Sequence, residues 1–214
     1  RLRALLVSVF TLAFATAIAT WWAGVFGTNT LLELREWGTA PGAVIGIIVY
    51  ELLHYWYHRA AHAWDWLWRA AHQMHHSAES LDAFGANYLH PLDTIAFTTL
   101  SSLVFFPLLG VTPEAGVIGA AFLTFNAMFQ HANVRTPRWV GYLIQRPESH
   151  GIHHARGVHR HNYSDLPLWD MVFGTFRNPA TFEGEVGLAP GGSARLGAML
   201  IGRDVSGDGD MEPA

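Results

Sequence analysis

The chain has 214 residues, enough for one domain with a buried core. Hydrophobic residues make up 50% of it and charged residues only 14%, against about 25% in ordinary soluble domains, so the composition favours a membrane protein. The net charge of −4 excludes a general basic field for nucleic acid. The absence of cysteine excludes disulfides, cysteine-ligated zinc and cysteine-ligated iron–sulfur clusters.

Four apolar segments are predicted to cross a membrane. The first covers residues 4–26, carries no charge, and is longer than the apolar core of a signal peptide. The others are expected at about 38–58, 94–112 and 113–131. The last two read as a helical hairpin with a very short loop, because Pro107 and Pro113 bracket a turn or a kinked helix end.

The arginines predict how these segments are oriented. The side that carries most of them is cytoplasmic by the positive-inside rule. These arginines are Arg1, Arg3, Arg59, Arg69, Arg135, Arg138 and Arg146. Nearly all histidines lie on the same side, so we expect an all-α, multi-pass integral membrane protein with a cytoplasmic helical cap, formed by 60–92 and 137–178. Residues 1–178 would form one catalytic domain, and the Gly-, Pro- and Asp-rich segment 179–214 a loosely ordered tail.

Histidines in three clusters and at one helix end are the candidate metal ligands. Within each cluster the spacing is i, i+3 or i, i+4, which places the rings on one helix face. The residues are His54 and His58; His72, His75 and His76; His150, His153 and His154; and His131 at the end of the fourth span. One zinc site needs about four ligands, so nine neutral imidazoles suit two metals with four or five ligands each.

Other histidines have weaker patterns. His62 extends the first cluster by one helical turn, with an interfacial role as an equal alternative. His159 and His161 follow the third cluster and are expected to be solvated.

Two other functions fit histidines in a membrane protein. A heme or electron-transfer protein needs axial histidines that face each other across two helices, and the clustered triplets argue against it. A divalent metal transporter places its ligands near the bilayer midplane, often in repeats. Here the histidines lie at one predicted surface and the sequence shows no repeat.

Further motifs follow the histidine clusters in a fixed order. They are Leu89-His90-Pro91-Leu92, Gln130-His131-Ala132-Asn133, Asn162-Tyr163-Ser164-Asp165, Trp169-Asp170 and Phe173-Gly174-Thr175. With the clusters and the Arg59 and Ser77 that follow two of them, this set resembles the fatty acid hydroxylase and sterol desaturase superfamily, the membrane di-iron lipid oxidases. The resemblance covers about residues 38–178.

The resemblance implies that the nine clustered histidines are the iron ligands. Some relatives present one more ligand four residues before the fourth-span histidine, where this chain has Ala127. The tenth ligand is therefore absent, a water held by Asn126, or one of His90 and His161. Candidate carboxylates that orient the ligands are Glu51, Glu148, Asp165 and, favoured because it follows Trp169 in the motif, Asp170.

The family further implies two iron ions and dioxygen, with hydroxylation or desaturation of an unactivated C–H bond as the reaction. Fatty acyl, sphingoid, ether-lipid and sterol-like substrates all remain open. Electrons would come from a ferredoxin, or from a small heme protein with its reductase, because the chain has no cysteine cluster and no dinucleotide fingerprint. Zinc can replace iron in over-produced protein. Candidates to line a lipid channel, with ordinary helix packing as the alternative, are Phe97, Phe105, Phe122 and Phe125.

Overall fold

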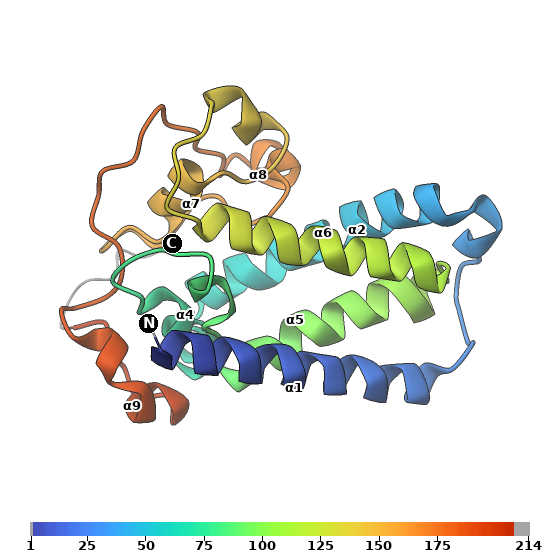
Figure 1. The fold of residues 1–214 in the computed structure, drawn as a ribbon, viewed down its shortest axis with the longest axis horizontal. Helices are drawn as coiled ribbons and strands as arrows, with labels where there is room; N and C mark the ends of the chain where they lie inside the picture. The colour runs from blue at the N-terminus through green and yellow to red at the C-terminus, as the bar shows by residue number, and fades with distance from the viewer. Residues whose placement is uncertain (1, 208–214) are drawn as a thin grey trace.

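The computed structural model describes residues 2–207. The regular elements assigned within that range are all helices, as the all-α prediction expected (Figure 1). Arg1, which was used to predict the orientation, and residues 208–214 of the predicted tail lie outside the described residues.

Four long helices run roughly parallel and antiparallel along the molecule (Figure 1). They are α1 (Leu2–Phe26), α2 (Thr39–Ala63), α5 (Pro91–Leu103) and α6 (Pro113–His131), at the positions of the four predicted spans. Helix α1 packs on α5, and α2 packs on α6. Two segments, Leu5–Phe26 and Pro91–Leu108, are long and apolar enough to cross a membrane.

Local sequence sets where α5 and α6 begin and end. Both start with a proline at the first position, where its missing N–H costs nothing. Helix α5 continues into a wider π-helical turn, η4 (Val104–Leu108), which contains Pro107. The backbone of residues 31–35 crosses this end and donates hydrogen bonds to the carbonyls of residues 107–110, so the last acceptors of the helix are satisfied.

Except for η1, the other short helices gather at the end of the bundle opposite η4 (Figure 1). In chain order the short elements are η1 (Leu34–Trp37), α3 (Asp65–Leu67), the π-helical η2 (Trp68–His72), α4 (Gln73–His76), η3 (Gly85–Asn87), η5 (Arg138–Tyr142), α7 (Pro147–His153), α8 (Pro167–Phe173), η6 (Gly192–Ala194) and α9 (Leu196–Leu200).

The segment 179–207 packs onto the histidine-bearing region, which differs from the loosely ordered tail expected from its composition. Leu188, Met199 and Val205 are buried in one cluster with Trp68 and Met74. A few apolar side chains therefore anchor a segment that glycine and proline keep free of long helices. Average composition hides such anchors because the intervening residues are polar or small.

The Phe105 ring fills the space between two helices of the core. It lies between Gly46 of α2 and Gly119 of α6, and a Cβ on either glycine would overlap it. Phe105 is 3% exposed, so it belongs to the core and does not line a channel, and Phe125 is exposed on the surface. The two glycines thus allow α2, α5 and α6 to approach one another closely.

We expect Gly119→Ala to lower the free energy of unfolding by about 1–3 kcal/mol, because the Phe105 ring cannot move away without meeting Gly46. Thermal unfolding of the detergent-solubilised protein measures the change. Gly24→Ala is the matched control, because a Cβ at Gly24 meets nothing within 4 Å. It should leave stability unchanged or raise it by up to about 1 kcal/mol. An equal loss of stability in both variants would contradict the close packing of Phe105 against the two glycines.

Candidate metal centre

Histidines from four separate segments converge where the short helices meet the long ones. Their candidate ligand atoms fall into two groups, and within each group all lie within 4.8 Å of one another. The five-histidine group consists of His58, His62, His72, His76 and His153. The four-histidine group consists of His75, His131, His150 and His154. The groups adjoin each other, since the rings of His76 and His154 stack at 4.1 Å.

Helical spacing explains how two identical H-x-x-H-H motifs serve both groups. In the motif on η2 and α4, the i and i+4 residues, His72 and His76, enter the five-histidine group, and His75 at i+3 enters the other. The motif on α7 does the reverse, since His153 at i+3 enters the five-histidine group while its i and i+4 rings enter the four-histidine group. Each motif therefore bridges the two groups.

Backbone carbonyls fix the tautomers of three of these rings. Nδ1 of His58 lies 2.6 Å from the Tyr163 carbonyl, Nδ1 of His131 lies 2.7 Å from that of Ala127, and Nδ1 of His153 lies 2.7 Å from that of His161. A carbonyl only accepts, so each Nδ1 carries the hydrogen. Each Nε2 of these three neutral rings then turns a lone pair towards the centre of its group.

The inward nitrogens are close enough to bind one cation together. Nε2 of His131 lies 3.1 Å from Nε2 of His75 and 3.0 Å from Nε2 of His150. Lone pairs that face one another without a hydrogen repel, unless a positive ion lies between them. Burial, followed by the neighbouring imidazoles, lowers the pKa of His150 and His154, which keeps both rings in the neutral form that binds metal. Buried neutral imidazoles without cysteine fit iron, zinc, copper or nickel.

Asp93 is the carboxylate that contacts a ring of the two groups most directly. Its Oδ2 lies 2.6 Å from Nδ1 of His72, and its Oδ1 accepts a hydrogen bond of 2.6 Å from the Tyr57 hydroxyl. Sequence reasoning did not select Asp93. The signal was present, because it is an acidic residue in the first turn of an otherwise uncharged apolar helix.

Asp170, favoured from the sequence, acts on a loop and contacts no ring of the two groups. Its carboxylate accepts hydrogen bonds from the backbone N–H of Tyr163 and Ser164 and from the Thr175 hydroxyl. It therefore holds the Tyr163 carbonyl that receives the His58 hydrogen. The Glu148 carboxylate accepts hydrogen bonds from the backbone and side chain of Thr136.

The surroundings of His54, His62 and His159 differ from those expected from the sequence. His62, given an interfacial role as an equal alternative, is buried in the five-histidine group. His159, expected to be solvated, is buried with its Nδ1 3.0 Å from Nδ1 of His76. His54 lies outside both groups and forms a third one with Glu51 and Asp165.

None of the three candidates for a tenth ligand reaches either group. The Asn126 amide donates to the Asp165 carbonyl at 2.8 Å. The His90 ring accepts from the backbone N–H of Leu92 and caps α5. His161 contributes its carbonyl, to His153, and its side chain is only partly buried.

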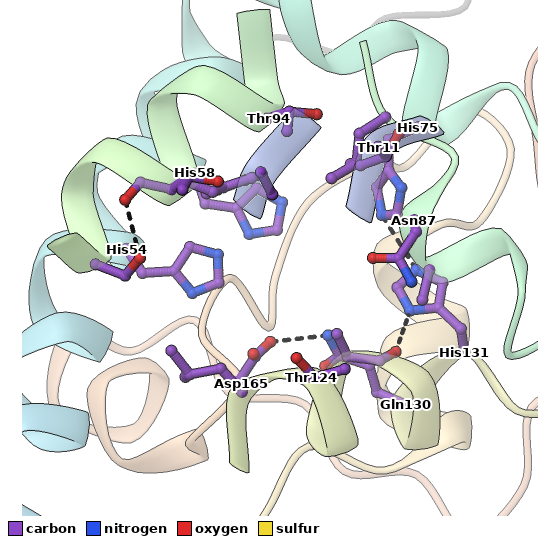
Figure 2. Close-up of a pocket in the computed structure, with 18 of the residues that line it drawn as sticks. Thr11, His54, His58, His75, Asn87, Thr94, Thr124, Gln130, His131 and Asp165 are labelled. Atoms are coloured by element: carbon purple, nitrogen blue, oxygen red, sulfur yellow. Dashed lines mark hydrogen bonds between the residues drawn. The ribbon is translucent and has the colours of Figure 1, made fainter. Parts of the chain in front are cut away.

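A cavity of about 390 Å³ leads to both groups. Side chains of α1, α2, α5 and α6 line it, and its inner end is formed by the rings His58, His72, His75, His131 and His150. Figure 2 shows His54 and His58 on one side of this space, His75 and His131 on the other, and Asp165 with Gln130 along a third edge. Of the four phenylalanines considered for a lipid channel, Phe97 lines it.

Comparisons with known proteins match the chain to one family model and to several curated enzymes. A family model described as fatty acid hydroxylase matches residues 43–175. The chain is 26% identical over 137 residues to sphinganine C4-monooxygenase 1 of Arabidopsis thaliana, covering 62% of this chain and 53% of that protein. It is 29% identical over 172 residues to ornithine lipid hydroxylase OlsE of Rhizobium tropici, covering 78% and 51%. It is 31% identical over 153 residues to alkylglycerol monooxygenase of Danio rerio, covering 68% and 32%.

The chain thus spans about half the length, or less, of these curated relatives. No solved structure matches it.

Replacing His62 and His54 separately tests which histidine belongs to the five-histidine group. We expect His62→Ala to lower the metal bound per chain by about one ion, because it removes one of five converging rings. His54→Ala is the matched control, about two helical turns away on the same helix, and should leave metal content unchanged. Elemental analysis of anaerobically purified protein gives both numbers. Loss of metal only in His54→Ala would overturn the grouping.

Asp93→Asn tests the carboxylate that orients His72. We expect metal affinity to fall by about 10–100-fold, because partners that hold a ligand ring contribute this much. Competition with a chelator of known affinity measures the change. Asp65→Asn, which alters an exposed carboxylate paired with Arg69, should have no effect.

Proposed function

Since the chain belongs to the fatty acid hydroxylase family, we propose that it oxidises a lipid C–H bond with dioxygen at the two histidine groups. One observation supports this most strongly: the inward-facing Nε2 lone pairs of His58 in one group and His131 in the other border a cavity that is lined in part by the long helices. The relatives include a sphinganine C4-monooxygenase and an ornithine lipid hydroxylase, which supports a lipid substrate.

Two iron ions would occupy the centre, one in each group. The proposed ligands number nine, as expected from the sequence, with His62 in the place given to His54. When bound, iron supplies the activation of dioxygen and the removal of hydrogen from an unactivated carbon. Hydroxylation then consumes one dioxygen, two electrons and two protons, and yields an alcohol and water. Desaturation of the same lipid is the alternative outcome.

The chain itself would position the substrate and exclude water. The cavity is lined mainly by alanine, leucine, threonine and serine side chains of α1, α5 and α6, which suit an alkyl chain with few polar groups. The Phe97 ring contacts the His54 ring edge to face at 5.1 Å and closes one wall beside the metal centre. Asp93 and the carbonyls of Ala127, His161 and Tyr163 would keep the imidazoles aimed at the metals during turnover.

We further propose that α1, α2, α5 and α6 all cross the membrane and that the histidine-bearing end faces the cytoplasm. Two apolar helices and the distribution of arginine support this arrangement. Lipid would then reach the cavity from the adjacent leaflet. An external donor, a ferredoxin or a small heme protein with its reductase, would supply the electrons.

The test is oxidation of lipid by the purified protein. Protein prepared anaerobically should contain about two irons per chain, and His153→Ala should lose iron and activity together. With a chemical reductant, isotopically labelled dioxygen and total membrane lipid, mass spectrometry should find a lipid that gains one labelled oxygen or loses two hydrogens. If the purified protein contains zinc in place of iron, it should be reconstituted with ferrous iron before the assay.

Three results would contradict the proposal. A stoichiometric heme, seen as a Soret band, would indicate an electron-transfer protein. Flux of divalent metal through proteoliposomes that contain the protein would indicate a transporter. Iron-loaded protein that leaves every lipid unchanged would exclude lipid oxidation.

A further inference from the structure

Next to the metal centre lies a group of three buried residues that the proposed chemistry does not use. Their candidate ligand atoms lie within 4.8 Å of one another. We call Glu51, His54 and Asp165 the acidic corner. His54 and Asp165 line the cavity, and Figure 2 shows both beside its open space. Glu51 lies behind them, with no exposed surface.

The hydrogen bonds of the acidic corner leave acceptor positions unfilled. Glu51 Oε2 accepts from the backbone N–H of Asp165 at 2.8 Å and of Leu166 at 3.2 Å, but Glu51 Oε1 is buried without a partner. Nδ1 of His54 is buried without a hydrogen bond of normal length, and its nearest recorded partner is Glu51 Oε2 at 3.6 Å. The Gln130 amide donates to Asp165 Oδ1 at 2.8 Å and so fixes the direction of that carboxylate.

The acidic corner holds two carboxylates but only one group that can carry a positive charge: Nδ1 of His54 lies 3.6 Å from Glu51 Oε2 and pairs with it when the ring is protonated. The sequence contains no lysine, and the arginine ion pairs recorded among residues 2–207 are made with Glu33, Asp65, Glu148 and Glu185. Glu51 and Asp165 have no arginine partner among them. Protonated His54 balances one of the two carboxylates, and a second buried carboxylate beside it stays costly without a positive partner of its own. The cavity is the side from which such a partner can reach Asp165.

We propose that the acidic corner binds the protonated amine of the lipid substrate and that Asp165 determines specificity for amine-bearing lipids. This inference rests on the proposed function, since it names the substrate class of the same site. An ammonium group supplies hydrogen-bond donors and a second positive charge to balance the second carboxylate. A fatty acid carboxylate would be repelled at this position, because it adds a third negative charge.

The position of the acidic corner also predicts where the lipid is oxidised. The His54 ring stacks on the His58 ring with centroids 5.4 Å apart and an interplanar angle of 9°. An amine held by the corner therefore lies one ring away from the five-histidine group. The carbon that reacts should lie a few bonds from the amine, and carbons near the end of the alkyl chain should not react.

Binding and oxidation of three lipids of equal chain length test the proposal. The probes are a saturated long-chain primary amine, the alcohol and the carboxylic acid, presented in the same detergent to metal-loaded protein. Under anaerobic conditions the amine should bind most tightly. Asp165→Asn should weaken amine binding by about 10–100-fold, the usual effect of a lost hydrogen bond to a charged group, and change alcohol binding little.

Matched variants separate recognition from stability. Glu148→Gln removes another carboxylate of equal burial, 7% exposed like Asp165, that lies away from the cavity. It should leave the order of the three lipids unchanged. Glu51→Gln should reduce the amine preference in the same direction as Asp165→Asn, and serves if the latter does not fold. Both corner variants should retain the metal content of the unmodified chain.

The outcomes distinguish this proposal from the proposed function. Equal binding of amine and alcohol, or an amine preference unchanged in both corner variants, would overturn the acidic corner as an amine site while lipid oxidation stands. An amine preference lost in the variants, with no lipid oxidised by the iron-loaded chain, would overturn the proposed function and leave the amine site. A third metal ion per chain, lost in Asp165→Asn, would show that a metal occupies the corner and overturn the proposal.

Discussion

The requirement that buried imidazoles turn lone pairs towards one another shapes the whole histidine-bearing end of the molecule. Such an arrangement is repulsive without a cation, so the surrounding chain must hold every ring in place. Carbonyls hold His58, His131 and His153, and Asp93 holds His72. The loops that carry these partners are in turn fixed by other polar groups, such as the Asp170 carboxylate beneath the Tyr163 backbone.

The two H-x-x-H-H motifs make the centre a single unit. Each motif places its i and i+4 rings in one group and its i+3 ring in the other, so neither group can form without both motifs. The short helices α4 and α7 are therefore cross-linked through the centre. Loss of one metal should disturb the other group, and the stability of this end should depend on metal more than on its small apolar core.

The sequence was sufficient to predict the all-α class, the four long helices and most of the converging histidines, because helical spacing is a local property. It could not choose between two rings on the same helix: His54 and His62 flank His58 symmetrically, and the structure brings His62 together with rings of α4 and α7. The role of Asp93 depends on how α5 packs against η2, and the packing of 179–207 depends on a few anchors such as Met199. Long-range contacts of this kind leave no periodic signal.

The use of main-chain carbonyls to hold ligand rings has an evolutionary consequence. Residue 161 contributes its backbone oxygen to this role while its own side chain is only partly buried, so that side chain can change as long as the turn persists. That turn is unusual, since His159, His161 and Asn162 adopt positive φ, and the Asn162 amide secures it through the carbonyls of Ser149 and Arg177. Selection should therefore act on Asn162 more strongly than on the neighbouring His161, whose carbonyl holds the His153 ring.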